Sequence, residues 1–208
     1  METIIENVKE MLSNRGDDLT SFIDMEKNYI KKDFYTKTLQ TYPHFYTDKT
    51  CVIVCILQEY RKNLFDEIKS KQKPLDETVH NFIENHNNKL NYIVILSNTK
   101  KLTTIDKGIL SQFDKQIQKQ GGIFQDFYDN TFMFNPLKHE LVPPHRKLSI
   151  TEVKEVMEKY MINSKTNFPY ILKNDVIAKW LGLKTGDIVE IKHYNPNSGL
   201  TYYYRCCM

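Results

Sequence analysis

The sequence predicts a two-domain α/β protein, with a largely parallel sheet in residues 1–135 and a small α/β domain in residues 136–208. In the first part, apolar runs typical of buried strands alternate with segments of helical spacing, an order that implies parallel strands covered by helices. Pro136 opens the second part, which ends in two strand-like segments joined by a turn. A chain of 208 residues with 40% hydrophobic residues is long enough for two compact cores.

The first domain begins with an amphipathic helix over residues 4–12, and Gly16 follows where a left-handed C-terminal cap is expected. Residues 51–57 and 92–96 form continuous apolar runs rich in β-branched side chains, which suit strands covered on both faces. Residues 75–90 keep helical spacing between these two strands.

A further helix is expected after Thr103 or Thr104, either of which could cap it, and Gly121-Gly122 closes it. Short strands around residues 123–128 and 131–134 complete the domain. Strand, helix, strand, helix and strand in succession imply a largely parallel sheet with helices packed on it.

The second domain has a well-specified first helix. Pro143-Pro144 predicts an extended approach to it. Ser149 and Glu152 then have the spacing of a capping box, and Leu148 and Val153 stand at the positions of a hydrophobic staple. A helix is therefore expected to start at this point.

The rest of the second domain is predicted to be short helix, strand, turn and strand. Asp175 could cap a short helix that Gly182 stops. A strand over residues 188–194 turns through residues 195–199 and returns as residues 200–207. The domain thus ends in a hairpin.

Charge argues against a protein that holds nucleic acid by basic character alone. The formal net charge is +3, and residues 136–208 carry 11 lysines and arginines against 7 aspartates and glutamates. That is +4 for the second part and −1 for the first, so neither part has a strong basic bias. Any contact with DNA is expected to be local and weak.

The cysteines and the hydropathy exclude two further classes. Cys51, Cys55, Cys206 and Cys207 lack zinc-ligand spacing and are expected to be buried thiols in a reducing compartment. The longest apolar run, residues 51–57, is far too short to span a bilayer. We expect a soluble intracellular protein without a membrane partner.

No set of residues in the sequence indicates an active site. His139-Glu140 begins a pattern found in zinc proteases, but the position four residues after His139 is Pro143 where that pattern needs histidine. Glu67 and Lys69 fit half of a metal-dependent nuclease site, so a free-standing Mg²⁺-dependent nuclease remains one alternative. We otherwise expect no catalytic residue, no metal and no cofactor.

A helix N-terminus offers the best candidate for a DNA-backbone contact in the first domain, because backbone N–H groups and the helix dipole there favour phosphate. The candidate residues are Lys100, Lys101, Thr103, Thr104 and Lys107. Trp180 and the tyrosines at 202–204 could stack on bases, but strand alternation is expected to bury about half of those rings. An independent DNA-binding factor is a second alternative, and the charge of the first domain argues against it.

Motifs at both ends of the chain match one known family. They are Val8-Lys9-Glu10-Met11-Leu12 before Arg15-Gly16, the run from His139 to His145, Leu181-Gly182-Leu183-Lys184 with Gly186, and Tyr204-Arg205 before Met208. In these motifs the chain resembles the fifth subunit of eukaryotic RNA polymerases, which polymerases I, II and III share and whose second domain corresponds to a small archaeal polymerase subunit. The resemblance is specific over residues 136–208 and thin over most of the first domain.

The resemblance implies an N-terminal jaw domain near downstream DNA and a C-terminal assembly domain bound to the largest polymerase subunit, with no catalysis in either. The partner-binding residues that it implies are His139, Glu140, Leu141, Val142, Pro143, His145, Pro169, Asp175, Gly182, Lys184, Gly186 and Arg205. The expected partners are the largest and other polymerase subunits and, weakly, the backbone of downstream duplex DNA. No small-molecule ligand is expected.

Several positions depart from the family pattern. Where the family usually has Leu-Pro-Arg-Ile, this chain has Phe168-Pro169-Tyr170-Ile171, and Val176 and Thr185 replace a usual proline and a usual basic residue. These differences bear on ionic contacts to the large subunit rather than on the fold.

The first domain departs further. The family's Thr-Pro-Ser-Ala jaw motif has its nearest counterpart in Thr103-Thr104-Ile105, which lacks the proline. Such divergence suggests a polymerase outside the familiar cellular set, and a large DNA virus with its own multisubunit enzyme is one hypothesis. The expected location is then the host cytoplasm and the virion, or the nucleus if the enzyme is cellular.

Overall fold

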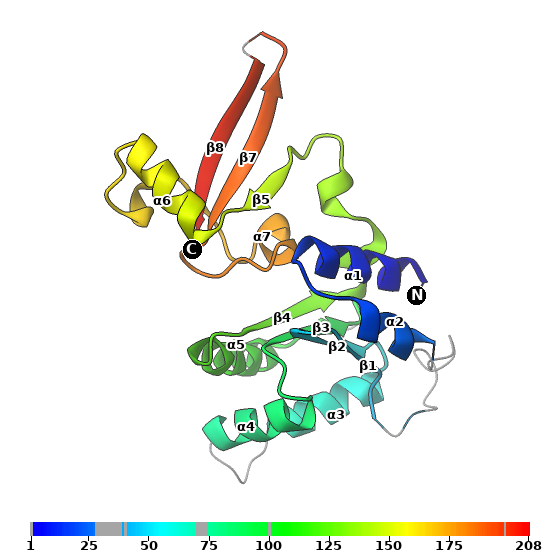
Figure 1. The fold of residues 1–208 in the computed structure, drawn as a ribbon. Helices are drawn as coiled ribbons and strands as arrows, with labels where there is room; N and C mark the ends of the chain where they lie inside the picture. The colour runs from blue at the N-terminus through cyan, green and yellow to red at the C-terminus, as the bar shows by residue number, and fades with distance from the viewer. Residues whose placement is uncertain (1, 28–38, 40, 70–74, 100, 198) are drawn as a thin grey trace. The chain divides into compact units, whose positions relative to one another are not determined.

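The computed structural model describes residues 2–27, 39, 41–69, 75–99, 101–197 and 199–208 (Figure 1). The chain divides into two compact units, Met1–Phe134 and Asn135–Met208. Both units mix helices and strands, so the predicted α/β class is confirmed. Among the described residues, no helix is both long enough and apolar enough to span a membrane.

The first unit is built on a four-stranded sheet with the order β1-β2-β3-β4. Strand β1 (His44–Tyr46) runs antiparallel to β2 (Thr50–Cys55), whereas β2, β3 (Asn91–Leu96) and β4 (Ile123–Tyr128) are parallel to one another. All of β2 and nearly all of β3 is buried, which explains why these strands are continuous apolar runs. The largely parallel sheet expected from the sequence is confirmed.

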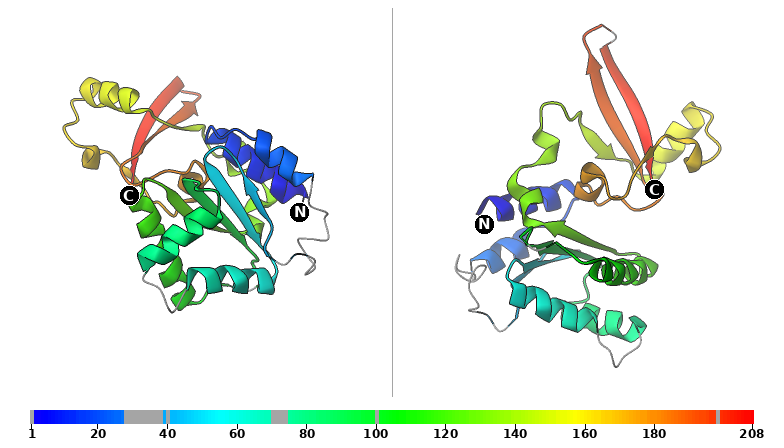
Figure 2. Two further views of the ribbon diagram at one scale, coloured as in Figure 1. Left: turned by 60° about the horizontal axis from the view of Figure 1, so that its bottom comes forward. Right: turned by 180° about the vertical axis from the view of Figure 1, so that it is seen from behind.

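Helices cover both faces of this sheet. On one face lie α3 (Gln58–Ile68), α4 (Leu75–Asn85) and α5 (Thr104–Lys119), and on the other lie α1 (Glu2–Asn14) and α2 (Thr20–Glu26), as the further views show (Figure 2). The helical side chains of the core on the first of these faces are Tyr60, Leu64, Phe65, Ile68, Val79, Phe82, Leu110, Phe113 and Ile117. They pack against the side chains of the two central strands that point to this face.

The opening helix, α1, forms as predicted. Its buried residues are Ile4, Ile5, Val8, Met11 and Leu12, the face expected from the spacing. Gly16 follows with φ of 79°, and the N–H of Asp17 donates to the carbonyl oxygen of Leu12 at 3.1 Å. This is the left-handed termination that the glycine predicted.

The connection from α5 to β4 depends on two glycines. Gly121 has φ of 81°, a conformation that L side chains rarely adopt. A Cβ atom on Gly122 would overlap the carbonyl oxygen of Leu90 and come within 2.8 Å of Cγ2 of Ile117. The chain before β3 therefore passes against Gly122 too closely to admit any side chain.

Four parts of the first unit differ from the sequence prediction. Residues 131–134, expected as a strand, belong instead to a 3-10 helix, η2 (Asp129–Met133), or follow it. The carboxylate of Asp129 accepts from the N–H groups of Asn98 and Asn130, which favours a turn, and Phe132 packs against Phe127. Strand β1 and the helices α2 and α3 were not predicted.

The second unit contains a four-stranded sheet with the order β5-β7-β8-β6. The long antiparallel strands β7 (Ile188–Asn195) and β8 (Gly199–Cys207) form the hairpin expected from the sequence. The edge strands β5 (His145–Lys147) and β6 (Tyr170–Ile171) are only 3 and 2 residues long and were not predicted. Short 3-10 helices, η3 (Pro136–Lys138) and η4 (Lys165–Asn167), lie in the connections.

The two faces of the hairpin contribute to two separate hydrophobic cores. Val189, Ile191 and Cys207 pack in one core with α7 (Val176–Trp180). Ile188 and Cys206 pack in the other core, on the side of α6 (Ile150–Lys159). Alternate residues of a strand point to opposite faces, so each strand serves both cores.

The predicted helix caps of this unit are confirmed. The N–H of Ser149 donates to Glu152 Oε2 at 2.8 Å, the N–H of Glu152 donates to Ser149 Oγ at 3.3 Å, and Leu148 and Val153 share one core. The Asp175 carboxylate accepts from the N–H of Ile177 at 2.8 Å at the start of α7.

The outer half of the hairpin is uncovered. Strand β5 pairs with β7 only as far as Ile191, and β6 pairs only with the last two residues of β8. Tyr202 and Tyr203 are consequently exposed and Tyr204 is partly buried, whereas Trp180 is fully buried. Of these four rings, two are thus buried or partly buried, as the expectation of about half implied.

All four cysteines are buried and free, as expected. Burial raises the pKa of the Cys207 thiol to about 11 and also raises that of Cys206. These thiols are therefore protonated and unreactive at neutral pH.

Candidate partner-binding groove

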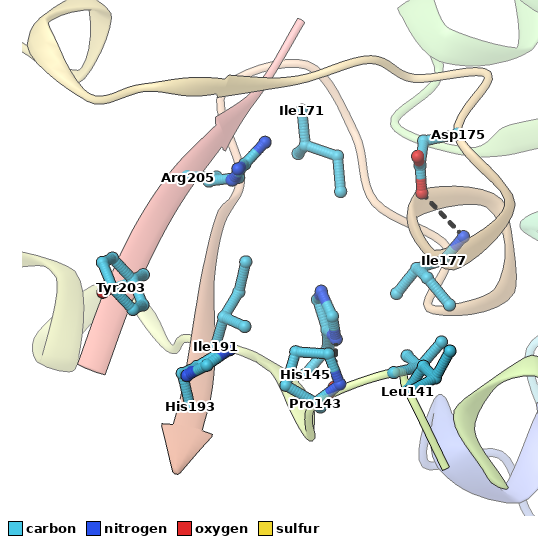
Figure 3. A pocket seen from close by; sticks show the side chains of 11 residues that line it. Leu141, Pro143, His145, Ile171, Asp175, Ile177, Ile191, His193, Tyr203 and Arg205 are labelled. Carbon is cyan, nitrogen blue, oxygen red and sulfur yellow. Dashed lines mark hydrogen bonds between the residues drawn. The ribbon is translucent and has the colours of Figure 1, made fainter. Parts of the chain in front are cut away.

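A groove of about 520 Å³ in the second unit brings together half of the predicted partner-binding residues (Figure 3). These residues are Leu141, Val142, Pro143, His145, Asp175 and Arg205. The other lining residues are Ile171, Ile177, Ile191, His193 and Tyr203. Segments far apart in the sequence therefore converge on one surface.

One wall of the groove is the loop before β5. The N–H of Val142 donates to the carbonyl oxygen of His139 at 2.9 Å, and the N–H of Leu141 donates to Nδ1 of the same histidine at 3.2 Å. After this turn the prolines extend the chain, and the N–H of Lys192 donates to the carbonyl oxygen of Pro144 at 3.0 Å. The loop is thus fixed to itself and to the edge of β7.

The floor of the groove is apolar. Ile171 and Ile191 are buried, and Ile177 is partly buried beside them in the core that includes α7. Ile191 lies opposite Tyr203 in the strand register, so both side chains stand on the same face of the hairpin. A floor that is part of a packed core keeps its shape when the groove is empty.

His145 stands in the middle of the groove, between Ile177 and Ile191 (Figure 3). Its Nδ1 lies 2.5 Å from the carbonyl oxygen of Pro143, which can only accept, so Nδ1 carries the hydrogen. Burial lowers the pKa of His145, against smaller opposing effects of Pro143 and Asp175. The ring is therefore neutral at pH 7, and Nε2 is a hydrogen-bond acceptor.

The two charged residues of the groove, Asp175 and Arg205, differ in the hydrogen bonds that they form. One oxygen of Asp175 accepts from the N–H groups of Ile177 and Ala178 as the cap of α7. Within the described residues, the exposed Arg205 side chain makes one long hydrogen bond, from Nη1 to the carbonyl oxygen of Tyr170 at 3.5 Å. Within the part of the chain that the structure describes, Arg205 forms no ion pair with a carboxylate.

The remaining predicted partner-binding residues lie outside the groove. His139 and Glu140 are exposed at the start of the loop, and Pro169 is exposed before β6. Gly182 is buried with φ of 62°, where it ends α7. This position has a structural role in the turn after the helix.

Lys184 and Gly186 also shape a turn. The N–H of Lys184 donates to Asp187 Oδ2 at 2.7 Å. Gly186 has φ of 87°, and its N–H donates to the carbonyl oxygen of Cys207 at 2.9 Å. Both residues thus support the start of β7 rather than the groove.

The predicted DNA-contact residues lie at the start of α5, apart from Lys100, which is outside the described residues. Lys101, Thr104 and Lys107 are exposed. Thr103 is the N-cap, and its hydroxyl accepts from the N–H of Asp106 at 3.2 Å. The capping hydroxyl uses one of the free backbone N–H groups at the start of the helix, and Asp106 adds a negative charge there. This helix start is therefore less suited to binding phosphate than expected.

Asp106 is the centre of an ion-pair cluster in the first unit. Its carboxylate lies 2.9 Å from Lys69 Nζ and 3.2 Å from Arg61 Nη2, and 13% of its side chain is exposed. Burial acts to raise the pKa of Asp106, but hydrogen bonds from Lys69 and Thr103 outweigh it and lower the pKa to about 2.

We expect Asp106→Asn to lower the free energy of unfolding by about 2 kcal/mol at pH 7, because it removes the charge that pairs with Lys69 and Arg61 and weakens the hydrogen bond accepted from the N–H of Thr103. The folded-state pKa lies below the ordinary value of 3.8. The contribution of Asp106 is therefore present above pH 3.8 and is lost as the pH falls towards 2. Urea unfolding of both proteins across this range measures the difference.

Asp66→Asn is the matched control, because Asp66 is exposed on α3 in the same unit. This variant should change the free energy of unfolding by about 0.5 kcal/mol or less. A difference between Asp106→Asn and the unaltered chain that stays constant down to about pH 2 would contradict the assignment.

The half-site proposed for a nuclease does not assemble. Glu67 accepts from the Tyr42 hydroxyl at 2.5 Å and from the Asn85 amide at 3.1 Å, and it lies near the buried His86. Lys69 is directed to Asp106 instead. Over the described residues, no group of three or more histidine, cysteine, aspartate or glutamate side chains could hold a metal ion.

The groove of the second unit has an apolar floor and is bordered by the exposed guanidinium of Arg205, which are features typical of a surface that binds another protein chain. Residues 134–207 match the family of the RNA polymerase Rpb5 C-terminal domain. The chain belongs to this family of RNA polymerase subunits, which confirms the resemblance seen in the motifs.

Curated relatives agree with the family. The DNA-directed RNA polymerase subunit Rpo5 of Pyrococcus horikoshii is 50% identical over 72 residues, which are 35% of this chain and 87% of that protein. The Rpo5 subunit of Pyrococcus abyssi has the same values. The Rpo5 subunit of Thermococcus kodakarensis is 44% identical over 72 residues, with the same two coverages.

Proposed function

We propose that this protein is a non-catalytic subunit of a multisubunit DNA-directed RNA polymerase. The observation that carries the proposal is the match of residues 134–207 to the Rpb5 C-terminal domain, with relatives that are polymerase subunits. The groove supports it, because it suits a module that is held by another chain. Catalysis by the polymerase would then belong to other subunits.

The second unit is the assembly domain in this proposal, and its partner is the largest polymerase subunit. The groove supplies an apolar floor, and the exposed loop from His139 to Leu141 borders it. An interface needs such an apolar centre within a polar rim. The other polymerase subunits are partners through the assembled complex.

The first unit is the jaw in this proposal and lies near downstream DNA. The exposed Lys101, Thr104 and Lys107 support a contact with the phosphate backbone. Asp106 and the near-neutral charge of this unit keep that contact weak. The protein would be located with its polymerase, in the nucleus of a cell or in the host cytoplasm and virion of a large DNA virus.

Affinity purification of the tagged full chain from its source, with identification of the chains that co-purify, tests the proposal. We expect the largest catalytic polymerase subunit among them. Recovery of the chain without any polymerase subunit, from a preparation in which the polymerase is intact, would overturn the assignment.

The two alternatives make different predictions for the isolated chain. A nuclease would cleave DNA in the presence of Mg²⁺ and lose this activity on Glu67→Ala. An independent DNA-binding factor would bind duplex DNA with strongly salt-dependent affinity. We expect neither activity, because Glu67 and Lys69 have separate partners and the first unit carries no basic excess.

A further inference from the structure

Arg205 has most of its hydrogen-bonding capacity unused. A guanidinium has five N–H donors arranged to bind a carboxylate through two parallel hydrogen bonds. Among the residues that the structure describes, the one hydrogen bond of the Arg205 side chain is to the carbonyl oxygen of Tyr170, at 3.5 Å, a distance at the limit for a hydrogen bond. An exposed guanidinium beside a preformed apolar floor is therefore a specific place for an anionic group.

The floor beside Arg205 indicates which kind of side chain would bind next to that anionic group. Ile171, Ile177 and Ile191 give the floor an aliphatic surface, and the rings of His145, His193 and Tyr203 line the groove beside it. Branched aliphatic side chains pack well on such a surface, whereas a nucleobase gains more from a flat aromatic ring. The floor thus favours an aliphatic side chain of a protein segment.

The charge in the rest of the groove favours a carboxylate of a protein over a phosphate chain. Asp175 lines the same groove and would repel the repeated negative charges of a nucleic acid. One oxygen of Asp175 already accepts hydrogen bonds from the N–H groups of Ile177 and Ala178. Asp175 therefore attracts a basic residue less strongly than Arg205 attracts an acidic residue. A single carboxylate near Arg205 avoids this repulsion.

We propose that the groove binds an extended segment of another polymerase subunit in which an aspartate or glutamate lies next to an aliphatic residue. The carboxylate binds Arg205, the aliphatic side chain packs on the isoleucine floor, and a backbone N–H or hydroxyl donates to Nε2 of His145. This inference rests on the proposed function, because it names the chemistry of the partner at the same groove.

Photocrosslinking in the assembled polymerase identifies the segment. Leu141 lines the groove and is 84% exposed, so p-benzoylphenylalanine can replace it in the full chain with little effect on packing. We expect a crosslink to a subunit peptide that contains an acidic residue beside an aliphatic one. The same photoreactive residue at Lys154, exposed on α6, is the control and should not capture this peptide.

Other crosslinking results would overturn the inference. They are capture of nucleic acid at position 141, capture of a segment without a carboxylate, and no capture at all from chains that are present in the purified enzyme. If the unaltered chain is missing from the enzyme, the proposed function itself fails. The two failures are therefore distinguishable.

Charge reversal tests the role of Arg205 directly. We expect Arg205→Glu to reduce the amount of the chain retained in the purified polymerase by about tenfold or more, since it opposes a carboxylate with a carboxylate. Lys192→Glu makes the same charge change on the opposite face of the hairpin and should alter retention less than about twofold. Lys192 is exposed, and its ammonium lies 5.9 Å from the centre of the Tyr202 ring.

Two further variants separate binding from folding. Arg205→Met keeps the aliphatic part of the side chain and should also weaken retention, without adding repulsion. Changing the carboxylate of the crosslinked segment to lysine should restore retention of Arg205→Glu, which a folding defect could not do. Retention of Arg205→Glu at the level of the unaltered chain would overturn the inference.

Discussion

A shortened chain that starts at residue 136 will enter the polymerase, whereas a chain that stops at Ser149 will not. The physical reason is that the second unit contains two hydrophobic cores of its own and the whole of the groove. Stopping at Ser149 removes β7 and β8, and with them the floor and Arg205. The measurement is the amount of each tagged chain in purified polymerase, compared with the full-length chain.

A control is needed because a shortened chain can fail to fold. Circular dichroism and thermal unfolding of the chain from residue 136 should show a cooperatively folded domain, since residues on both faces of its sheet are packed. Efficient incorporation of the chain that stops at Ser149 would contradict the proposal, because it would place the attachment in the first unit.

Gly122→Ala will destabilise the first unit by about 3 kcal/mol, although it adds only one methyl group. The new Cβ atom would overlap the carbonyl oxygen of Leu90, which belongs to the backbone and cannot turn aside. The N–H of Gly122 also donates to the carbonyl oxygen of Ile117 at 3.1 Å, so a shift of the chain would disturb the end of α5. Urea unfolding followed by far-ultraviolet circular dichroism measures the effect.

Gly108→Ala is the matched control, because it makes the same substitution on α5 of the same unit. A Cβ atom on Gly108 would meet nothing within 4 Å, and alanine is the better helix former. This variant should stabilise the unit by about 0.5 to 1 kcal/mol. Equal effects of the two substitutions would show that helix propensity, and not the close approach at Gly122, determines the outcome.

Hydrogen exchange assigns the Gly122→Ala effect to one unit. Amides of β3 and β4 should exchange faster in the variant, because both strands lie beside the altered position. Amides in the inner halves of β7 and β8 belong to the other compact unit and should keep their rates. Faster exchange in both units would mean that they do not unfold independently.

Local signals explain which parts of the fold could be predicted. Ser149 and Glu152 determine a helix start through contacts within four residues, and the same applies to Gly16 at the end of α1. The buried strands β2 and β3 were recognisable because both of their faces are covered. Each of these features depends on nearby residues or on burial alone.

Elements that depend on distant partners could not be predicted. Strand β6 is only 2 residues long and exists through its pairing with the end of β8. The start of α3 follows Leu57, which provides no side-chain cap, so no start signal is visible in the sequence. Propensity is too weak to specify such elements without their tertiary contacts.

The groove was predictable only in part for the same reason. Family motifs indicated Leu141, His145 and Arg205, which lie in recognisable runs. The isoleucine floor lacks any motif and is formed by residues from β6, α7 and β7. Tyr203 could have been inferred from Arg205, because residues two apart on a strand share a face.

Both hydrophobic cores of the second unit use alternate residues of β7 and β8. The lengths of these strands are therefore constrained during evolution. Loss of one codon between Tyr203 and Cys207 would turn the preceding side chains of β8 to the opposite face. The surface that now faces the groove would then face α6, and both cores would be damaged at once. The outer half of the hairpin lies beyond β5 and β6, so insertions and deletions can accumulate at its turn during evolution.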